Sequence, residues 1–443
     1  MTQFSNLRVL VAGLGKSGMA AADFLLKRGA RVFIGDEKAL AETGNAAWVA
    51  ARAVQYLQLT ADTAPDFDLI VQSPGVPLEK PYFENARRAG VKVTGEVELA
   101  APFLQGPVMG ITGANGKTTV TTLAGEMLET SGVDCQVGGN IGRPVTDMVD
   151  SSRADQWNVL ELSSFQLETV DTFHADTAVL LNITANHLDR HKTMDAYVAA
   201  KSRLLETQLT DGVAILNAND AWCRKLAGRA RGTVQWFSSA GPVEQGYWIA
   251  DGWIVRDGKR VFEVSSIGIP GRHNAENVMA AAAASSIAGA KDEALREAAY
   301  AFQGVEHRIQ FVRELRGVRF YNDSKSTTAE ATETAVGAFG GDNLWLIMGG
   351  SDKGLDYRHL QPLLRPKARG VLLIGKIAPD LARQLEGLPV VPCGTLDQAV
   401  TVAAVNATAG AVVLLSPGTA SYDQFQNYEQ RGRAFVALVN ALN

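Results

Sequence analysis

Cysteine is scarce in this sequence. Its 443 residues include only Cys135, Cys223 and Cys393, which lie far apart along the chain. An odd and widely spaced set shows neither the spacing of a metal site nor a disulfide framework. The chain therefore fits a reducing compartment.

Long apolar runs and a strong charge of either sign are lacking as well. The sequence has no stretch of about 18 apolar residues. Its first 15 residues show no basic region followed by an apolar stretch and a cleavage site. We therefore expect no signal peptide, no membrane insertion and a cytoplasmic location. The net charge of −5 provides no basic field for nucleic acid, so we expect no nucleic-acid partner.

The rest of the composition is that of an ordinary globular enzyme, with 46% hydrophobic and 20% charged residues. At roughly 150 residues per domain, the length predicts about three domains. Short apolar segments followed by glycines and then helical stretches recur, which predicts α/β units with parallel sheets. The predicted strands are 7–13, 31–35, 69–72, 108–113, 159–162, 178–182, 214–217, 343–350, 370–374 and 411–416, with helices at 18–28, 118–131 and 274–290.

The stretch 233–264 departs from this alternation. Short segments there alternate with turns such as Arg256-Asp-Gly-Lys259, which predicts a small antiparallel β insertion. Domain boundaries near 94–98 and near 304–307 divide the chain into domains 1–97, 98–305 and 306–443.

The most specific local motif is Thr112-Gly-Ala-Asn-Gly-Lys-Thr-Thr119, between a predicted strand and a predicted helix. A glycine loop that enters a helix offers backbone N–H groups to a phosphate. In this setting Lys117 reaches the β- and γ-phosphates and the Thr118 hydroxyl holds Mg²⁺. The usual spacing is shortened, since Gly113 lies only three residues before Gly116. The alternative is a lysine-bearing helix start that binds nothing.

A second glycine loop, Gly13-Leu-Gly-Lys-Ser-Gly18, is followed by Asp36 at the end of the next predicted strand. The pattern is typical of a dinucleotide site, but the same geometry holds any pyrophosphate and the acidic residue suits any ribose. By itself it favours an NAD-dependent dehydrogenase as much as any other nucleotide-binding protein. The later loop 73–77 is either part of this site or a surface turn fixed by its prolines.

Glu161 ends a predicted strand, where ligands bind in open α/β sheets, and its carboxylate suits Mg²⁺. His187 and His191 are four residues apart, but the intervening sequence lacks the glutamate of a zinc-binding helix. We interpret His191 as a solvated loop histidine. Lys201 lies on a predicted helix, where a lone lysine is usually a surface residue that pairs with a neighbour such as Glu206.

Further polar clusters follow at predicted strand ends: 271–277, 306–308, 322–327, 352–354 and 416–425. In an extended segment Asp323 and Lys325 point to the same side, where they can serve a phosphate and its metal ion. So many clusters in one chain are hard to explain as helix caps and turns alone.

Together these motifs resemble the Mur ligase family of peptidoglycan synthesis, and within it the branch that adds D-glutamate. The resemblance runs from Gly13 to about Gly432. It rests on the two glycine loops and on 140–142, 161–168, 322–327 and 421–432. The absence of an Asp-Asn-Pro-Arg tetrapeptide disfavours the relatives that add diaminopimelate or lysine. One departure is Asn186, where the family has an acidic residue before the histidine.

The resemblance implies an α/β fold of three domains. A Rossmann-like N-terminal domain binds the UDP substrate, a central P-loop domain binds ATP, and a Rossmann-like C-terminal domain binds the amino acid. The implied substrates are ATP, UDP-N-acetylmuramoyl-L-alanine and D-glutamate, with two Mg²⁺ ions and a monomeric enzyme. The alanyl carboxylate attacks the γ-phosphate to give an acyl phosphate, which the D-glutamate amine then attacks.

The same resemblance assigns residues by position. For ATP they are Gly113, Asn115, Gly116, Lys117, Thr118, Thr119, Asn274, Asn277, Arg308 and Asp323. For the UDP substrate they are Leu14, Gly15, Asp36, Ser73, Pro74, Gly75, Asn140, Ser163 and His187. For D-glutamate they are Lys325, Thr327, Lys353, Ser421, Tyr422 and Tyr428. The metal ligands are Thr118 and Glu161 for one ion, with His187 and a carbamylated Lys201 for the other. The catalytic set is Lys117, Glu161, His187, Lys201, Arg308 and Lys325.

Three other hypotheses remain. A dehydrogenase uses only the first glycine loop and Asp36. A P-loop regulator without enzymatic activity uses Lys117 but not Lys201, Lys325 or Ser421. An amide ligase of another Mur type, or of the folylpolyglutamate type, uses the P-loop. A folylpolyglutamate-type ligase, however, has no obvious use for the N-terminal glycines.

Overall fold

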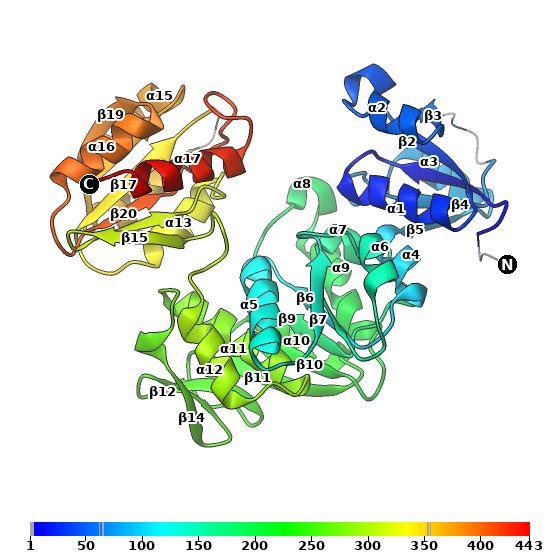
Figure 1. The fold of residues 1–443 in the computed structure, drawn as a ribbon, viewed down its shortest axis with the longest axis horizontal. Helices are drawn as coiled ribbons and strands as arrows, with labels where there is room; N and C mark the ends of the chain where they lie inside the picture. The colour runs from blue at the N-terminus through cyan, green and yellow to red at the C-terminus, as the bar shows by residue number, and fades with distance from the viewer. Residues whose placement is uncertain (1–3, 62, 64–65, 352–353, 355) are drawn as a thin grey trace. The chain divides into compact units, whose positions relative to one another are not determined.

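The computed structural model describes residues 4–61, 63, 66–351, 354 and 356–443, and over these residues the chain forms three β-sheets with flanking helices (Figure 1). The α/β prediction is confirmed. The chain divides into two compact units, Met1–Val264 with Glu276–Ala299, and Ser265–Ala275 with Tyr300–Asn443. The first unit holds two of the sheets, and the predicted domain boundaries remain predictions.

The N-terminal sheet is parallel, with strand order β3-β2-β1-β4-β5. The order reverses at β1, so the loops that follow β1 and β4 open into one crevice at the carboxyl ends of the strands, as in other doubly wound sheets. Its elements are β1 (Arg8–Ala12), α1 (Lys16–Lys27), β2 (Arg31–Asp36), α2 (Ala46–Ala51), β3 (Gln55–Gln58), β4 (Leu69–Gln72), α3 (Pro81–Arg88), β5 (Lys92–Gly95) and α4 (Glu96–Ala100).

The central sheet has the order β14-β13-β12-β11-β10-β9-β6-β8-β7. Strand β6 lies between β9 and β8, so the loops after these three strands meet at one edge. The strands are β6 (Val108–Thr112), β7 (Cys135–Gly139), β8 (Trp157–Glu161), β9 (Thr177–Leu180), β10 (Val213–Asn217), β11 (Thr233–Ser238), β12 (Gly246–Ala250), β13 (Trp253–Arg256) and β14 (Lys259–Glu263). The helices are α5 (Lys117–Thr130), α6 (Val145–Met148), α7 (Ser164–Leu167), α8 (Leu188–His191), α9 (Met194–Glu206), α10 (Ala221–Leu226), α11 (Arg272–Ile287) and α12 (Asp292–Ala301).

The β insertion predicted over 233–264 is only partly antiparallel. Strand β11 pairs in parallel with both β10 and β12, so it continues the central sheet, and only β12–β14 form an antiparallel meander at its edge. The predicted turn between β13 and β14 is confirmed. Asp257 and Gly258 both have positive φ, 50° and 74°, as a two-residue type I′ hairpin requires.

The C-terminal sheet has the order β15-β16-β20-β17-β18-β19, with only β15 antiparallel. Its strands are apolar on both faces because helices cover both: Leu346 and Leu414 belong to one buried cluster, Ile347 and Val413 to the other. The elements are β15 (Gln310–Leu315), β16 (Val318–Asn322), α13 (Ala329–Gly337), β17 (Leu344–Gly349), α14 (Gln361–Leu364), β18 (Ala368–Ile374), α15 (Ala378–Gln384), β19 (Val390–Gly394), α16 (Leu396–Asn406), β20 (Val412–Leu415) and α17 (Tyr428–Asn440).

The strands and helices expected from the pattern are present, with ends shifted by a few residues. The helix expected at 274–290, for example, runs from Arg272 to Ile287. Within the described ranges, none of the helices combines the length and apolar character needed to span a membrane.

Candidate active site

The P-loop joins β6 to α5, as predicted. Gly116 has a φ of 84°, and a Cβ there would lie 2.4 Å from Asn277 Oδ1, so both backbone conformation and space require glycine. The ammonium group of Lys117 donates to the carbonyl oxygens of Gly113 and Ala114, both at 3.0 Å. Asn277, one of the predicted ATP residues, thus lies directly against the P-loop. Asn274, one turn earlier on α11, is buried and donates to Pro270 O at 2.7 Å.

Asn182 shapes the P-loop and was missed by the sequence reasoning. Its carbonyl oxygen accepts from Ala114 N at 2.9 Å, and its Oδ1 accepts from Asn115 N at 2.8 Å. The signal was its place at the end of the predicted strand 178–182, but only the pairing of β9 with β6 brings it to the loop.

Two buried oxygen atoms near the P-loop lack partners. Thr118 Oγ1 and Glu161 Oε2 have no hydrogen-bond partner among the described residues, although both are buried. The other carboxylate oxygen, Glu161 Oε1, accepts from Asn140 Nδ2 at 2.7 Å. Hydroxyl and carboxylate oxygens are the ligands that Mg²⁺ prefers, so the residues fit this ion.

No group of three or more His, Cys, Asp or Glu side chains forms a metal cluster in the described part of the chain.

Lys201 on α9 is almost fully buried, with 1% of its surface exposed. Its ammonium donates to Gly113 O at 2.8 Å and to Thr112 Oγ1 at 3.2 Å. Burial and the nearby charge of Lys117 hold its pKa well below the usual range, against the opposing effect of Glu161. The surface-lysine interpretation is therefore wrong, and Glu206 pairs with Arg229 instead, at 2.7 Å.

His187 and His191 lie at the two ends of the short helix α8 and differ in environment. His187 is exposed and has a left-handed backbone with a φ of 54°. The centroid of its ring lies 4.9 Å from that of the Phe165 ring. His191 is 6% exposed and lies between Glu168 and Ser164, at 3.2 and 2.9 Å. The interpretation of His191 as a solvated loop histidine is wrong, because α8 turns its ring inward. Burial lowers the pKa of this imidazole.

Two other residues of this region have backbone contacts. Asn186 Oδ1 accepts from His187 N at 2.9 Å. Ser163 caps the N-terminus of α7, where its Oγ accepts from Gln166 N at 3.2 Å.

The glycines after β1 divide into two kinds. A Cβ on Gly13 would lie 2.6 Å from Val76 Cγ2, and one on Gly18 would lie 2.0 Å from Gly13 O. These two positions serve packing within the domain. A Cβ on Gly15, the residue before α1, would have Ser73 Oγ as its nearest neighbour among the described atoms, at a distance of 3.5 Å. Gly15 is therefore the glycine whose backbone a ligand can approach.

The remaining N-terminal candidates lie at or just after the carboxyl ends of β1, β2 and β4. Leu14 is buried, so only its backbone can face a ligand, while Asp36 ends β2 and accepts from Lys38 N at 3.1 Å. Ser73 is buried after β4, Pro74 and Gly75 follow it in the turn, and Lys16 donates to Gly142 O at 2.5 Å. Asn140 and the N-terminal glycine loop thus belong to adjoining segments.

In the C-terminal unit, Asp323 and Lys325 do not lie in an extended segment. A turn follows β16, in which Ser326 N donates to Asp323 O at 3.0 Å. The Asp323 carboxylate is buried and accepts from Ser416 Oγ at 2.8 Å and from Ile309 N at 3.2 Å. Burial raises its pKa to about 6. The expectation of an extended segment is wrong, because the chain turns at Ser324 and Lys325.

Lys325, Tyr428 and His307 form a group beside this turn. The Lys325 ammonium lies 5.6 Å from the Tyr428 ring centroid, and that ring is 6.1 Å from His307. Arg308 follows with its Nε buried and unpartnered among the described atoms.

The other D-glutamate candidates differ in exposure. Thr327 is half-buried, Ser421 is buried, and Tyr422 is 75% exposed. Lys353 lies outside the described residues.

Arg431 on α17 is a second residue that the sequence reasoning missed. Its guanidinium is 1% exposed and donates to Ser324 O at 2.8 Å and to Thr419 O at 3.2 Å. Burial lowers its pKa to about 10. It ties the loop after β16 to the loop after β20, which are the loops that carry Lys325 and Ser421.

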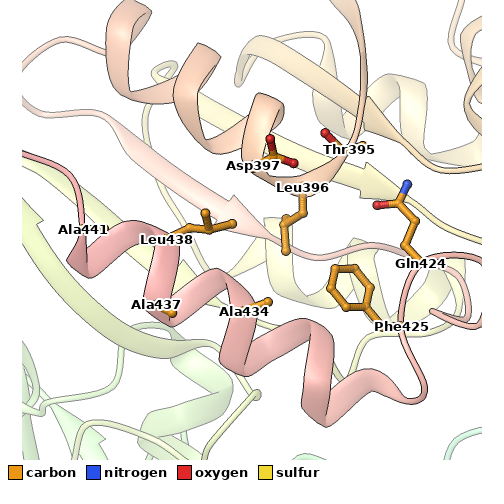
Figure 2. Close-up of a pocket in the computed structure, with 9 residues that line it drawn as sticks. All are labelled: Thr395, Leu396, Asp397, Gln424, Phe425, Ala434, Ala437, Leu438 and Ala441. Carbon is orange, nitrogen blue, oxygen red and sulfur yellow. The ribbon is translucent and has the colours of Figure 1, made fainter.

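A groove of about 720 Å³ lies elsewhere in this unit, between α17 and the start of α16 (Figure 2). Its lining is mostly apolar: Thr395, Leu396, Asp397, Gln424, Phe425, Ala434, Ala437, Leu438 and Ala441. It includes none of the predicted site residues, and such a surface suits neither a nucleotide nor glutamate.

Sequence comparison identifies the family to which each part of the chain is similar. The chain matches the Mur ligase MurD-like N-terminal domain over residues 7–95, the Mur ligase middle domain over 111–285, and the Mur ligase glutamate ligase domain over 307–418. The UDP-N-acetylmuramoylalanine–D-glutamate ligase of Solibacter usitatus is 52% identical over 99% of both chains. The enzyme of that name from Acidobacterium capsulatum is 46% identical over 99% of this chain and 97% of its own.

The chain belongs to the Mur ligase family. Solved structures of the family share its fold. The UDP-N-acetylmuramate–alanine ligase of Thermotoga maritima superposes with a TM-score of 0.60 at 18% identity, covering 98% of this chain and 100% of its own. The MurF ligase of the same organism, solved in complex with ADP, also has a TM-score of 0.60, at 16% identity and with coverage of 99% and 95%. The Mur ligase architecture of three α/β domains is therefore present.

Proposed function

We propose that this chain is an ATP-dependent ligase that adds D-glutamate to UDP-N-acetylmuramoyl-L-alanine, releasing ADP and phosphate. The proposal is carried by the P-loop and its surroundings, where buried, unpartnered oxygen atoms of Thr118 on α5 and Glu161 at the end of β8 fit Mg²⁺. Relatives that match the whole chain bear the name of this activity. We place the reaction in the cytoplasm, where ATP and UDP-linked precursors are found, and expect a monomer.

The first step joins two anions, the alanyl carboxylate and the γ-phosphate of ATP. A carboxylate is a poor electrophile, and its conversion to an acyl phosphate supplies a leaving group. Lys117 and the N–H groups of the P-loop neutralise negative charge as the phosphoryl group moves. Thr118 and Glu161 would hold Mg²⁺, which would add charge neutralisation of the same kind.

A second ion is expected beside His187, held with a carbamate on Lys201. An ammonium group has no lone pair for a metal ion, whereas a carbamate offers anionic oxygens. The nitrogen lone pair of a neutral Lys201 bonds to the carbon of CO₂, and the proton leaves to solvent. The low pKa and the burial of Lys201 favour the neutral amine that this addition needs.

The other roles follow the family assignment. Gly113, Asn115, Gly116 and Thr119 line the phosphates, Asn274 and Asn277 serve the adenosine, Arg308 serves the γ-phosphate and Asp323 the ribose. The UDP substrate contacts Leu14, Gly15, Asp36, Ser73, Pro74, Gly75, Asn140, Ser163 and His187. D-glutamate contacts Lys325, Thr327, Lys353, Ser421, Tyr422 and Tyr428.

Phosphate release tests the proposal against its alternatives. Release should require both UDP-N-acetylmuramoyl-L-alanine and D-glutamate, and product mass from a panel of D- and L-amino acids should single out D-glutamate. Release that needs neither substrate points to a P-loop regulator. Tight NAD binding without phosphate release points to a dehydrogenase. Product with folate or with another amino acid contradicts the substrate assignment.

A further inference from the structure

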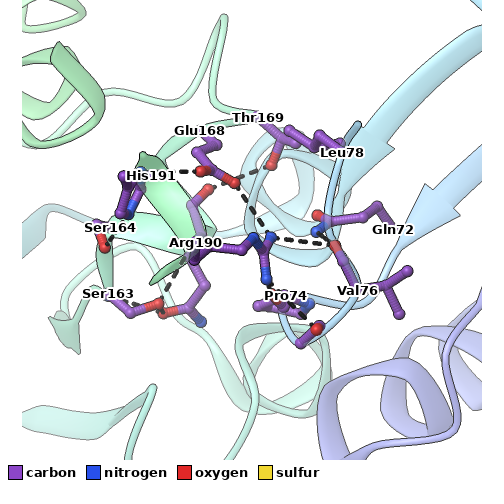
Figure 3. Close-up of polar contacts among 12 residues, drawn as sticks. Gln72, Pro74, Val76, Leu78, Ser163, Ser164, Glu168, Thr169, Arg190 and His191 are labelled. Atoms are coloured by element: carbon purple, nitrogen blue, oxygen red, sulfur yellow. Dashed lines mark hydrogen bonds and ion pairs between the residues drawn. The ribbon is translucent and has the colours of Figure 1, made fainter. Parts of the chain in front are cut away.

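Arg190 on α8 holds a loop of the N-terminal domain, and no role above makes use of it. Its Nη1 donates to Pro74 O at 3.1 Å and Gly75 O at 3.3 Å, and its Nη2 donates to Val76 O at 3.1 Å. Figure 3 shows the guanidinium directed at this loop, with the Glu168 carboxylate on its other side, 3.3 Å from Nη2. One side chain thus binds three successive carbonyl groups and a carboxylate.

The contacts are largely shielded from water. The side chains of Arg190 and Glu168 are 10% and 15% exposed, and the guanidinium lies 4.5 Å from the ring centroid of Phe165. Only a planar guanidinium can stack on a ring while its N–H groups diverge toward several carbonyl oxygens. A lysine keeps the charge but lacks the planar group with diverging N–H donors.

Arg190 is linked to His187 in two ways. Its backbone N donates to His187 O at 3.1 Å, and its side chain reaches His187 through Phe165. The Phe165 ring contacts both the guanidinium and, at 4.9 Å, the His187 imidazole. A non-glycine residue with a φ of 54° needs support from its surroundings, and the short helix α8 provides that support.

His191 closes the network. Glu168 Oε1 lies 3.2 Å from His191 Nδ1, and the His191 ring stacks on Phe165 at 5.3 Å. The Glu168 carboxylate is therefore shared between Arg190 and His191. Arg190 therefore connects the 73–77 loop directly to α8, the helix that His187 precedes, and its contacts with Glu168 and Phe165 connect the loop to α7.

We propose that Arg190 is a positioning residue: it fixes the 73–77 loop against α8 and so holds the UDP-linked substrate in register with His187. The inference rests on the proposed function, because it takes this loop as part of the UDP-substrate site. If the contact serves stability alone, replacing Arg190 should lower the stability of the protein and leave the KM values unchanged. If Arg190 positions the loop, replacing it should raise the KM of one substrate selectively.

Arg190→Met removes the guanidinium group and keeps most of the aliphatic part of the side chain, and Arg190→Lys keeps the positive charge. We expect both variants to raise the KM for the UDP substrate at least tenfold, with the KM for ATP changed by less than twofold. Arg229→Met is the matched control, since Arg229 pairs with Glu206 in the same domain and should leave both KM values unchanged. If the methionine variant does not fold, the lysine variant carries the test.

Hydrogen exchange of the full-length protein gives a readout independent of activity. The Val76 amide donates to Ser73 O at 2.9 Å, and in both Arg190 variants a peptide spanning 70–80 should exchange faster than in the wild type and in the Arg229 variant. Unchanged exchange, or an Arg190→Lys enzyme with wild-type KM, overturns the positioning role. A wild-type enzyme that forms no product with D-glutamate contradicts the proposed function instead, while the exchange comparison still decides the role of Arg190.

Discussion

The amine of Lys201 lies 2.8 Å from the carbonyl oxygen of Gly113, so a lysine on α9 is buried under the first residue of the P-loop. The two residues are 88 positions apart. This relationship places a group with a lowered pKa beside the phosphate site and motivates the carbamate hypothesis.

Lys201→Ala should be nearly inactive and should regain part of its turnover in acetate, because the small acid can occupy the place of the carbamate oxygens. Lys201→Met is the matched control, since its side chain fills the same space and should not be rescued. Crystals grown near neutral pH should show extra density on the amine. A plain, mobile lysine in a structure with both metal ions bound would show that the hypothesis is wrong.

Lys117→Ala should lower kcat by about 10²–10³, equivalent to roughly 3–4 kcal/mol of transition-state stabilisation, because a preorganised charge at the phosphate is lost. The fold should persist, since no core volume is removed. Lys225→Ala is a suitable control, because Lys225 lies on α10 with its ammonium 4.6 Å from the Trp222 ring. Near-wild-type turnover of the Lys117 variant in a steady-state assay contradicts the P-loop assignment.

Gly15→Val should raise the KM for the UDP substrate far more than the KM for ATP, because a branched side chain blocks access to the backbone before α1. Gly18→Val should instead unfold the domain, since a Cβ there meets Gly13 O at 2.0 Å. Gly228→Val, at an open surface position, should leave the fold and both KM values unchanged. Equal effects of Gly15→Val on both KM values would argue against a UDP site in this crevice.

Glu96, at the start of α4, should make stability depend on pH. Burial raises the pKa of its carboxyl to about 7, although hydrogen bonds from Thr146 oppose the shift. The folded protein keeps this proton between about pH 4.5 and 7 while the unfolded chain loses it, so the stability contributed by this group falls as pH rises through that window. Glu96→Gln should behave like the wild type near pH 5 and be more stable at pH 8, by up to about 3 kcal/mol.

Urea unfolding at pH 5 and pH 8 measures these stabilities. Glu98 provides a control in which the pKa shift has the opposite sign. Burial alone would raise the pKa of its carboxyl, but hydrogen bonds from Thr172, Asp171 and Phe173 outweigh this effect and lower it. Glu98→Gln should therefore destabilise the protein at pH 8. A Glu96→Gln variant whose stability follows that of the wild type at both pH values contradicts the assignment.

Domain closure is the last prediction. The P-loop belongs to one compact unit, and Lys325 and Tyr428 belong to the other, yet the D-glutamate amine must meet the acyl phosphate. We expect a rigid-body rotation about residues near Gly304 and Val305 when ATP and the UDP substrate bind. Small-angle scattering of the free and ligand-bound enzyme measures it. Identical profiles in all ligand states would count against closure.

The sequence by itself determined most of the strands and helices and the positions of the glycine loops. Glycine loops after apolar strands, and Glu161 at a strand end, are local patterns, because the carboxyl ends of parallel strands meet at one edge whatever the remaining contacts. The hairpin at Asp257 and Gly258 is equally local, since its positive φ angles follow from the residues themselves. The sequence therefore located these features directly.

Only the tertiary structure decided how distant side chains are used. Asn182 reaches the P-loop because β9 pairs with β6, and His191 is buried because α8 turns its ring toward Phe165 and Tyr197. Arg190 meets Gly75 across 115 positions of sequence. Burial and contact partners depend on which segments pack together, and a local pattern carries no information about a partner so far along the chain.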